Sequence, residues 1–174
     1  MAYKPFDLSG KTALVTGGNG GIGLGMADAM AQAGANVCIW GTNADKNASA
    51  LEQLSAHGTE VAAMICDVSD EAQVEGRFAE TIKRFGNLHG VFANAGVSGG
   101  REQVPFTEMT TERWRQIVGI NLDGTFFTFR AAARHMVEHG EGGRIAGTAS
   151  LAAISGAARN EHYAATKGGM VSMI

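Results

Sequence analysis

Short apolar runs rich in β-branched residues alternate along the chain with longer stretches in which apolar positions recur at helical spacing. The short runs predict strands at residues 12–16, 36–40, 60–66, 89–93 and 144–148, and their continuous apolar character is typical of strands buried on both faces. The longer stretches predict helices at 21–33, 44–57, 71–85, 111–139 with a break, and 161–174. Alternating strands and helices predict an α/β fold, a Rossmann-type doubly wound parallel sheet flanked by helices.

The composition indicates one domain over residues 1–174. A chain of 174 residues that is 45% hydrophobic and 18% charged can bury one sizeable core. The glycine-rich pieces at 96–100 and 140–143 are only long enough to be loops, so we expect no interdomain linker.

Charge and patterning exclude several classes of partner. The formal net charge is −3 and no run of lysine or arginine occurs, so we expect no nucleic-acid partner. No apolar stretch resembles a signal peptide or reaches membrane-spanning length, so we expect no membrane partner and a cytoplasmic protein. Cys38 and Cys66 lie in strand-like runs, which suits buried thiols in a reducing compartment. The five histidines show no ligand spacing, so we expect no metal.

The first predicted strand leads directly into a glycine-rich loop, Thr16-Gly17-Gly18-Asn19-Gly20-Gly21-Ile22-Gly23, and then into a helix. Glycine permits positive φ and close backbone approach, so such a loop can hold a pyrophosphate against a helix start. Two registers fit, with Gly18, Gly20 and Gly23 as G-x-G-x-x-G or Gly17, Gly21 and Gly23 as T-G-x-x-x-G-x-G. The spacing does not choose between them. The alternative to phosphate binding is an ordinary glycine turn, which the strand–loop–helix context disfavours.

The end of the second predicted strand lacks the acid that often reads the adenosine ribose. The chain there reads Gly41-Thr42-Asn43, and the charged residues Asp45 and Lys46 already belong to the next helix. Thr42 can hydrogen-bond either a ribose hydroxyl or a 2′-phosphate, so this position leaves NAD and NADP both open.

Three side chains near the end of the chain suit proton transfer. Tyr163 and Lys167 are four residues apart on one helix face, and Ser150 lies thirteen residues before the tyrosine. Taken singly, a serine after a strand is a turn former and a Tyr–Lys pair is a solvated helix face. Together they suit alcohol–carbonyl chemistry, because an ammonium and an oxidised nicotinamide both favour ionisation of a phenol whose pKa in water is about 10. Ser150 would hold the substrate oxygen while Tyr163 exchanges the proton that accompanies hydride transfer.

The chain resembles the short-chain dehydrogenases/reductases over nearly its whole length, because separate motifs occur in the same order as in that family. The motifs are the glycine loop at residues 16–23, Asp67-Val68 after the third strand, Ala93-Asn94-Ala95-Gly96 after the fourth, and Asn121, Ser150, Tyr163 and Lys167. The resemblance implies an oxidoreductase that transfers a hydride between NAD or NADP and a small alcohol or ketone.

The resemblance also implies a role for each motif residue. Tyr163 would be the catalytic base, with Lys167 holding ribose hydroxyls and lowering the tyrosine's pKa, and Ser150 orienting the substrate oxygen. Asn121 would kink its helix and position a proton-relay water, or only kink the helix. The residues implied for the cofactor are Gly17, Asn19, Gly21, Ile22 and Gly23 at the pyrophosphate, Asp67 and Val68 at the adenine, and Asn94, Ala95 and Gly96 along the adenosine side. The alternative for Asp67 is a helix N-cap, which is compatible with an adenine contact.

The chain departs from the family pattern in three places. The ribose-reading acid is absent, and Ala93 stands where the family often has asparagine. Family members continue past the Tyr–Lys helix into further strands and a segment that covers the substrate, so we expect a domain that is incomplete at its C-terminus. A catalytically silent dinucleotide-binding fragment is therefore the rival to an active enzyme, and nothing specific supports an epimerase or dehydratase.

The resemblance implies less about substrate and assembly. Substrate specificity would reside largely in the loop at 97–106 and in the C-terminal segment of longer family members. The helices at 111–139 and 161–174 would pack against their copies in a homodimer or homotetramer.

Overall fold

A computed structural model describes residues 6–98 and 104–174. The glycine-rich piece predicted at 96–100 and the specificity loop predicted at 97–106 therefore lie partly outside the described residues. The strands are β1 Thr12–Thr16, β2 Asn36–Gly41, β3 Val61–Ile65, β4 Gly90–Ala93 and β5 Arg144–Gly147. The helices are α1 Gly21–Gln32, α2 Ala44–Ser55, α3 Glu71–Phe85, α4 Thr111–Val118, α5 Gly124–His139, α6 Ala152–Ser155 and α7 Glu161–Met173.

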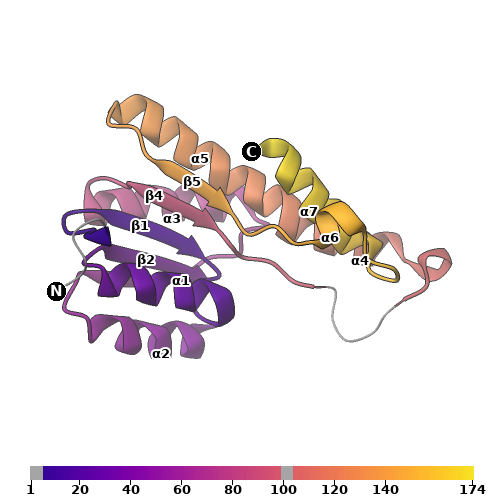
Figure 1. Cartoon of the computed structure of the whole chain (residues 1–174), viewed down its shortest axis with the longest axis horizontal. Coiled ribbons are helices and arrows are strands. Elements are labelled where there is room, and N and C mark those ends of the chain that lie inside the picture. Colours follow the sequence, from indigo (N-terminus) through magenta and orange to yellow (C-terminus); the bar gives the residue numbers. More distant parts are fainter. Residues whose placement is uncertain (1–5, 99–103) are drawn as a thin grey trace.

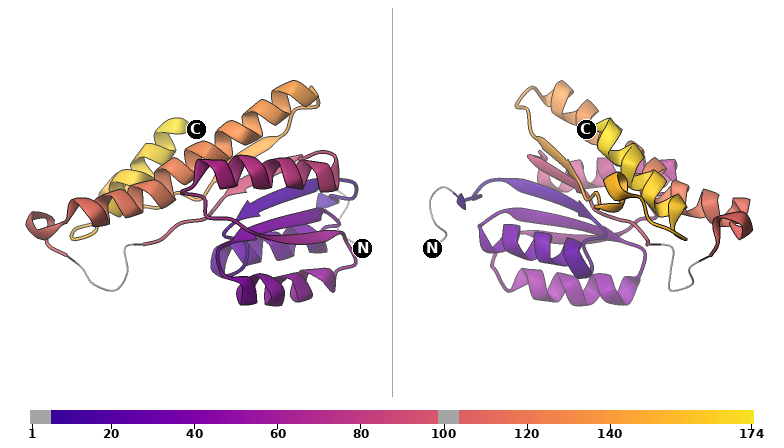
Figure 2. Two further views of the ribbon diagram at one scale, coloured as in Figure 1. Left: turned by 180° about the vertical axis from the view of Figure 1, so that it is seen from behind. Right: turned by 45° about the vertical axis from the view of Figure 1, so that its right-hand side comes forward.

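The strands form one parallel sheet in the order β3-β2-β1-β4-β5. Figure 1 shows α1 and α2 together on one face of this sheet, with α3 and α5 on the other. Figure 2 shows the same layers from behind and from the side. This is the predicted doubly wound architecture, and each predicted strand is present with its ends moved by at most one residue.

Alternate residues of β2 supply the two cores of the domain. Cys38 and Trp40 join the cluster beneath α3 and α5, whereas Val37 and Ile39 join the cluster beneath α1 and α2. Successive side chains of a strand point to opposite faces, so the uninterrupted apolar run is explained by burial on both sides. All four side chains are fully buried.

The helix predicted at 111–139 does contain a break. A π-helical turn, Gly119–Asp123, separates α4 from α5, and Asn121 lies at its centre. Two short elements were not predicted, the four-residue α6 and the 3₁₀ turn Phe106–Glu108, because neither is long enough to show a helical period.

The strand order reverses between β1 and β4. These strands are neighbours in the sheet, although β2, β3 and three helices lie between them in the sequence. In open α/β sheets this reversal leaves a crevice beyond the carboxyl ends of the strands, where ligands bind. The glycine loop follows β1 and the segment 94–98 follows β4, so both lie at the crevice. Among the described residues, no helix is long and apolar enough to cross a membrane.

Candidate active site

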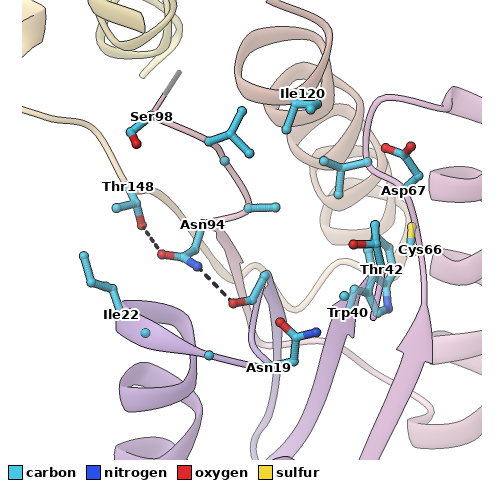
Figure 3. A pocket seen from close by; sticks show the side chains of 18 of the residues that line it. Asn19, Ile22, Trp40, Thr42, Cys66, Asp67, Asn94, Ser98, Ile120 and Thr148 are labelled. Atoms are coloured by element: carbon cyan, nitrogen blue, oxygen red, sulfur yellow. Dashed lines mark hydrogen bonds between the residues drawn. The ribbon is translucent and has the colours of Figure 1, made fainter. Parts of the chain in front are cut away.

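A cavity of about 810 Å³ lies at the carboxyl ends of the strands. Its lining comes from the ends of all five strands, from the π-helical turn and from α7: Gly17, Asn19, Gly20, Gly21, Ile22, Trp40, Gly41, Thr42, Lys46, Cys66, Asp67, Val68, Asn94, Ala95, Gly96, Val97, Ser98, Ile120, Thr148, Tyr163 and Lys167. Figure 3 shows Asn19 and Ile22 on the glycine-loop side, Thr42, Trp40, Cys66 and Asp67 at one end, and Ser98 and Thr148 at the other. The size falls within the range of small-molecule sites, about 300–1,000 Å³.

The backbone of the glycine loop decides between the two registers. Gly17 and Gly21 adopt φ of +64° and +52°, in the left-handed region that favours glycine. A Cβ on Gly23 would lie 2.2 Å from the Gly17 carbonyl oxygen, so no side chain fits there. Gly20 has an extended backbone and open space around its Cβ position. The T-G-x-x-x-G-x-G register, with Gly17, Gly21 and Gly23, therefore meets a requirement for glycine at each position, and the other register does not.

The loop presents the start of α1 to the cavity. Gly20 is the N-cap residue and forms no side-chain capping hydrogen bond, and the first turn of α1 contains no acidic residue. The amide groups and the positive end of the helix dipole thus face a site that favours an anion. Ile22, although apolar, is 66% exposed at the cavity wall, where it is available to cover a ligand.

Asn94 ties together the ends of β1, β4 and β5. Its Nδ2 donates to the Thr16 carbonyl at 3.1 Å and to the Gly17 carbonyl at 3.4 Å. Its Oδ1 accepts from the Thr148 hydroxyl at 3.1 Å (Figure 3). The Thr16 hydroxyl in turn accepts from the amides of Asn94 and Ala95, each at 3.0 Å. These bonds fix the glycine loop against the floor of the cavity.

Asp67 lies at the cavity wall, in a turn before α3. Its Oδ1 accepts from the amide and the hydroxyl of Ser69 at 2.9 and 2.7 Å. The N-cap of α3 is Asp70, whose carboxylate accepts from the Gln73 amide, so the capping alternative for Asp67 is wrong. Val68 also lines the cavity and is buried.

Lys167 lines the cavity from α7. It is only 4% exposed, its Nζ donates to the Thr148 carbonyl at 2.6 Å, and burial lowers its pKa below the usual range. The Nζ atom lies 5.6 Å from the ring centroid of Tyr163, and both residues line the cavity. A Cβ on Gly96 would lie 3.7 Å from the same Nζ, so the segment after β4 passes close to the ammonium. The phenol, the ammonium and the glycine loop thus share one cavity.

Asn121 is fully buried and does not line the cavity. Its Oδ1 accepts from the Val97 amide at 2.8 Å, while its Nδ2 donates to the Val97 carbonyl at 2.9 Å and to the Thr166 hydroxyl at 3.3 Å. The side chain therefore links the segment after β4 to α7, one residue before Lys167.

Ser150 is not among the residues that line the cavity; it lies in the segment between β5 and α6. Its hydroxyl oxygen accepts from the Ala152 amide at 3.2 Å. A hydroxyl that accepts one bond still has a proton to donate, so the Ser150 side chain keeps a donor for an oxygen atom within its reach.

Three polar residues of the cavity were not named as site residues from the sequence: Thr148, Lys46 and Ser98, the last of which falls in the predicted specificity loop at 97–106. Thr148 hydrogen-bonds both Asn94 and Lys167, and its position at the carboxyl end of the predicted strand 144–148 was the available signal. Lys46 was assigned to the helix after β2 and not to the site, although it lines the cavity from the first turn of α2. Among the described residues, no three His, Cys, Asp or Glu side chains are grouped so that they could hold a metal ion.

Comparisons with known proteins identify relatives along nearly the whole chain. A family model described as short chain dehydrogenase matches residues 11–174. The chain is 37% identical over 168 residues to 2,5-dichloro-2,5-cyclohexadiene-1,4-diol dehydrogenase of Sphingobium indicum, covering 96% of this chain and 65% of the relative. It is 36% identical to L-rhamnose 1-dehydrogenase (NAD(P)(+)) of Azotobacter vinelandii, covering 94% of this chain and 64% of the relative.

Solved structures of other dehydrogenases and reductases share the fold of this chain. NAD⁺-bound xylitol dehydrogenase superposes with a TM-score of 0.91 at 30% identity, covering 95% of this chain and 63% of that one. Levodione reductase gives a TM-score of 0.91 at 33% identity, covering 95% and 64%. The chain thus spans about two thirds of the length of the proteins that it matches.

Proposed function

This chain belongs to the short-chain dehydrogenase family, and on that premise we propose that it transfers a hydride between a nicotinamide dinucleotide, NAD or NADP, and a small alcohol or carbonyl compound. The observation that carries the proposal is the joint lining of one cavity by the glycine loop and by Tyr163 and Lys167. The relatives named above are dehydrogenases and reductases of small molecules, which supports the same class of reaction.

The described residues fit such a cofactor. The loop with positive φ at Gly17 and Gly21 offers backbone amides to a pyrophosphate, and the crowding at Gly23 keeps the start of α1 close to it. We assign the pyrophosphate to Gly17, Asn19, Gly21, Ile22 and Gly23, the adenosine side to Thr42, Asp67, Val68, Asn94, Ala95 and Gly96, and the nicotinamide ribose to Tyr163 and Lys167. When bound, the dinucleotide supplies or accepts the hydride.

The proton that accompanies the hydride is the task of Tyr163. In reduction its hydroxyl donates a proton to the substrate oxygen, and in oxidation the phenol oxygen takes that proton back. The nearby Lys167 ammonium, held by the Thr148 carbonyl, stabilises the negative charge that the phenol oxygen carries without its proton. Ser150 donates a hydrogen bond to the substrate oxygen, and Asn121 holds the segment around Val97 against α7.

The substitution Tyr163→Phe tests this assignment, since it removes the hydroxyl and preserves the ring. Oxidation of reduced cofactor by a panel of small ketones and keto sugars, followed by absorbance, should slow by a factor of about 10² to 10⁴ because general acid–base catalysis is lost. The Kd of the reduced cofactor, measured by calorimetry, should change little. Equal turnover by the two proteins would refute the role of Tyr163, and cofactor binding without turnover by the native protein would leave dinucleotide binding as its only function.

We also propose that the chain forms a homodimer or homotetramer through α4, α5 and α7. Phe126 and Val137 on α5 are 43% and 81% exposed, and apolar side chains of this size are often covered in an assembly. Light scattering coupled to size-exclusion chromatography gives the mass in solution, and a monomer at micromolar concentration would contradict the proposal.

A further inference from the structure

At Gly41, the end of β2, two asparagine side chains fill the space that a side chain able to read a ribose would need. A Cβ on Gly41 would lie 2.1 Å from Asn19 Nδ2 and 2.6 Å from Asn47 Oδ1, well inside contact distance. The strand end is the place from which an acid hydrogen-bonds the adenosine 2′-hydroxyl in dinucleotide folds. A carboxylate at residue 41 would require the Asn19 side chain to leave its bond to Asn47, so the packing disfavours an acid at this position.

The space beside Gly41 is filled by two amides that bind each other. Asn19 Nδ2 donates to Asn47 Oδ1 at 2.7 Å, and Asn47 Nδ2 donates to the carbonyls of Gly41 and Met64, each at 3.1 Å. Asn47 is only 5% exposed, so this arrangement is part of the fold. The corner of the cavity next to β2 is therefore built from neutral groups.

The Lys46 ammonium brings a positive charge to the part of the cavity next to β2. Thr42 and Lys46 are both exposed and both line the cavity. Within residues 6–98 and 104–174, no ion pair or side-chain hydrogen bond engages the Lys46 ammonium. Asp67 is the carboxylate among the lining residues, and its Oδ1 already accepts two bonds from Ser69. A hydroxyl and an ammonium that line the same cavity suit a phosphate monoester.

We infer that the cavity selects a dinucleotide phosphorylated at the adenosine 2′ position, with Lys46 and Thr42 as the residues that contact this phosphate. The inference rests on the proposed function, because it assumes that the adenosine end of the cofactor lies beside β2. Lys46 is then a residue that selects the cofactor. Asn47 is a positioning residue, because it holds Asn19 in the space that an acid at residue 41 would need.

Two nucleotide fragments isolate the 2′-phosphate from the rest of the cofactor. Calorimetry with adenosine 2′,5′-bisphosphate and with adenosine 5′-monophosphate should give a Kd at least about tenfold lower for the bisphosphate, because a charge-assisted hydrogen bond is worth that factor or more. The variant Lys46→Gln should remove most of this preference and leave the Kd of the monophosphate within about twofold. The control Lys83→Gln removes the same charge from exposed α3, away from the cavity, and should keep the preference.

The outcomes separate this inference from the proposed function. Equal affinity for the two fragments, or a preference unchanged in Lys46→Gln, would overturn the 2′-phosphate site while dinucleotide binding still stands. If the folded native protein bound neither fragment nor the reduced cofactors, the proposed function would fall as well. A ratio of NADPH to NADH affinity that drops toward one in Lys46→Gln, with Lys83→Gln unchanged, would support the inference with the complete cofactors.

Discussion

Replacing Gly23 by alanine should show how tightly the glycine loop is held. A Cβ there would lie 2.2 Å from the Gly17 carbonyl oxygen and 2.4 Å from Asn94 Nδ2. The Gly17 carbonyl oxygen belongs to the backbone of a loop that Asn94 holds in place, so it cannot rotate away as a side-chain atom could. The added methyl group must push the loop away from the helix and weaken the bonds that Asn94 donates.

The magnitude follows from three contributions. Overpacking of this kind costs about 1–3 kcal/mol. A weakened hydrogen bond from Asn94 adds about 1 kcal/mol. Alanine in a helix is favoured over glycine by about 1 kcal/mol, which offsets part of the loss. We expect Gly23→Ala to lower the free energy of unfolding by about 2 kcal/mol and to weaken binding of reduced cofactor, because the loop that holds its pyrophosphate has moved.

Gly25 provides the matched control, two residues further along α1. It is exposed, and a Cβ there would meet nothing within 4 Å. Gly25→Ala should therefore raise the free energy of unfolding by about 0.5–1 kcal/mol, since only the helix preference acts. Urea unfolding of the native protein, Gly23→Ala and Gly25→Ala measures both changes in the free energy of unfolding. The midpoints can be compared directly if the denaturant dependence m is the same for all three proteins. A Gly23→Ala protein as stable as the native one, or two variants with equal losses, would refute the reasoning.

Two further predictions concern stability. Burial is the main cause that lowers the pKa of His89, His135 and His162 below 6.5, so these rings stay neutral in the folded chain while the unfolded chain takes up protons. The free energy of unfolding should then be highest above pH 7 and fall as the pH drops through 6.5, as measured by urea unfolding at a series of pH values, and a flat profile between pH 7.5 and about 5.5 would contradict this. Asp70→Ala should cost about 1 kcal/mol because the α3 N-cap bond to Gln73 is lost, whereas Asp70→Asn should retain most of it; equal losses in the two variants would argue against the cap.

Most of the fold could be predicted because burial on both faces leaves a direct mark on a parallel strand. The run in β2 is apolar at consecutive positions, and both of its faces are covered by helices. The break within the 111–139 helix pattern was predicted, but its π-helical form was not: the side chain of Asn121, at the centre of that turn, bonds Val97, which is distant in sequence. Helix α6 is too short to carry a period at all.

The site shows where spacing stops being informative. Spacing could not choose the glycine register, because the choice depends on the φ of Gly17 and Gly21 and on the carbonyl that faces Gly23. Tyr163 and Lys167 could be paired, because residues four apart on a helix share a face. Lys46 could not be placed, since only the packing of α2 against the sheet turns its side chain toward the cavity.

A crystal structure of the complex with NADPH tests the central claim most directly. We predict the pyrophosphate against the first turn of α1 at Gly21, the adenosine beside Thr42 and Asp67, and the nicotinamide ring next to Tyr163 and Lys167. A dinucleotide bound elsewhere, or bound here with its nicotinamide end at Thr42, would contradict the account.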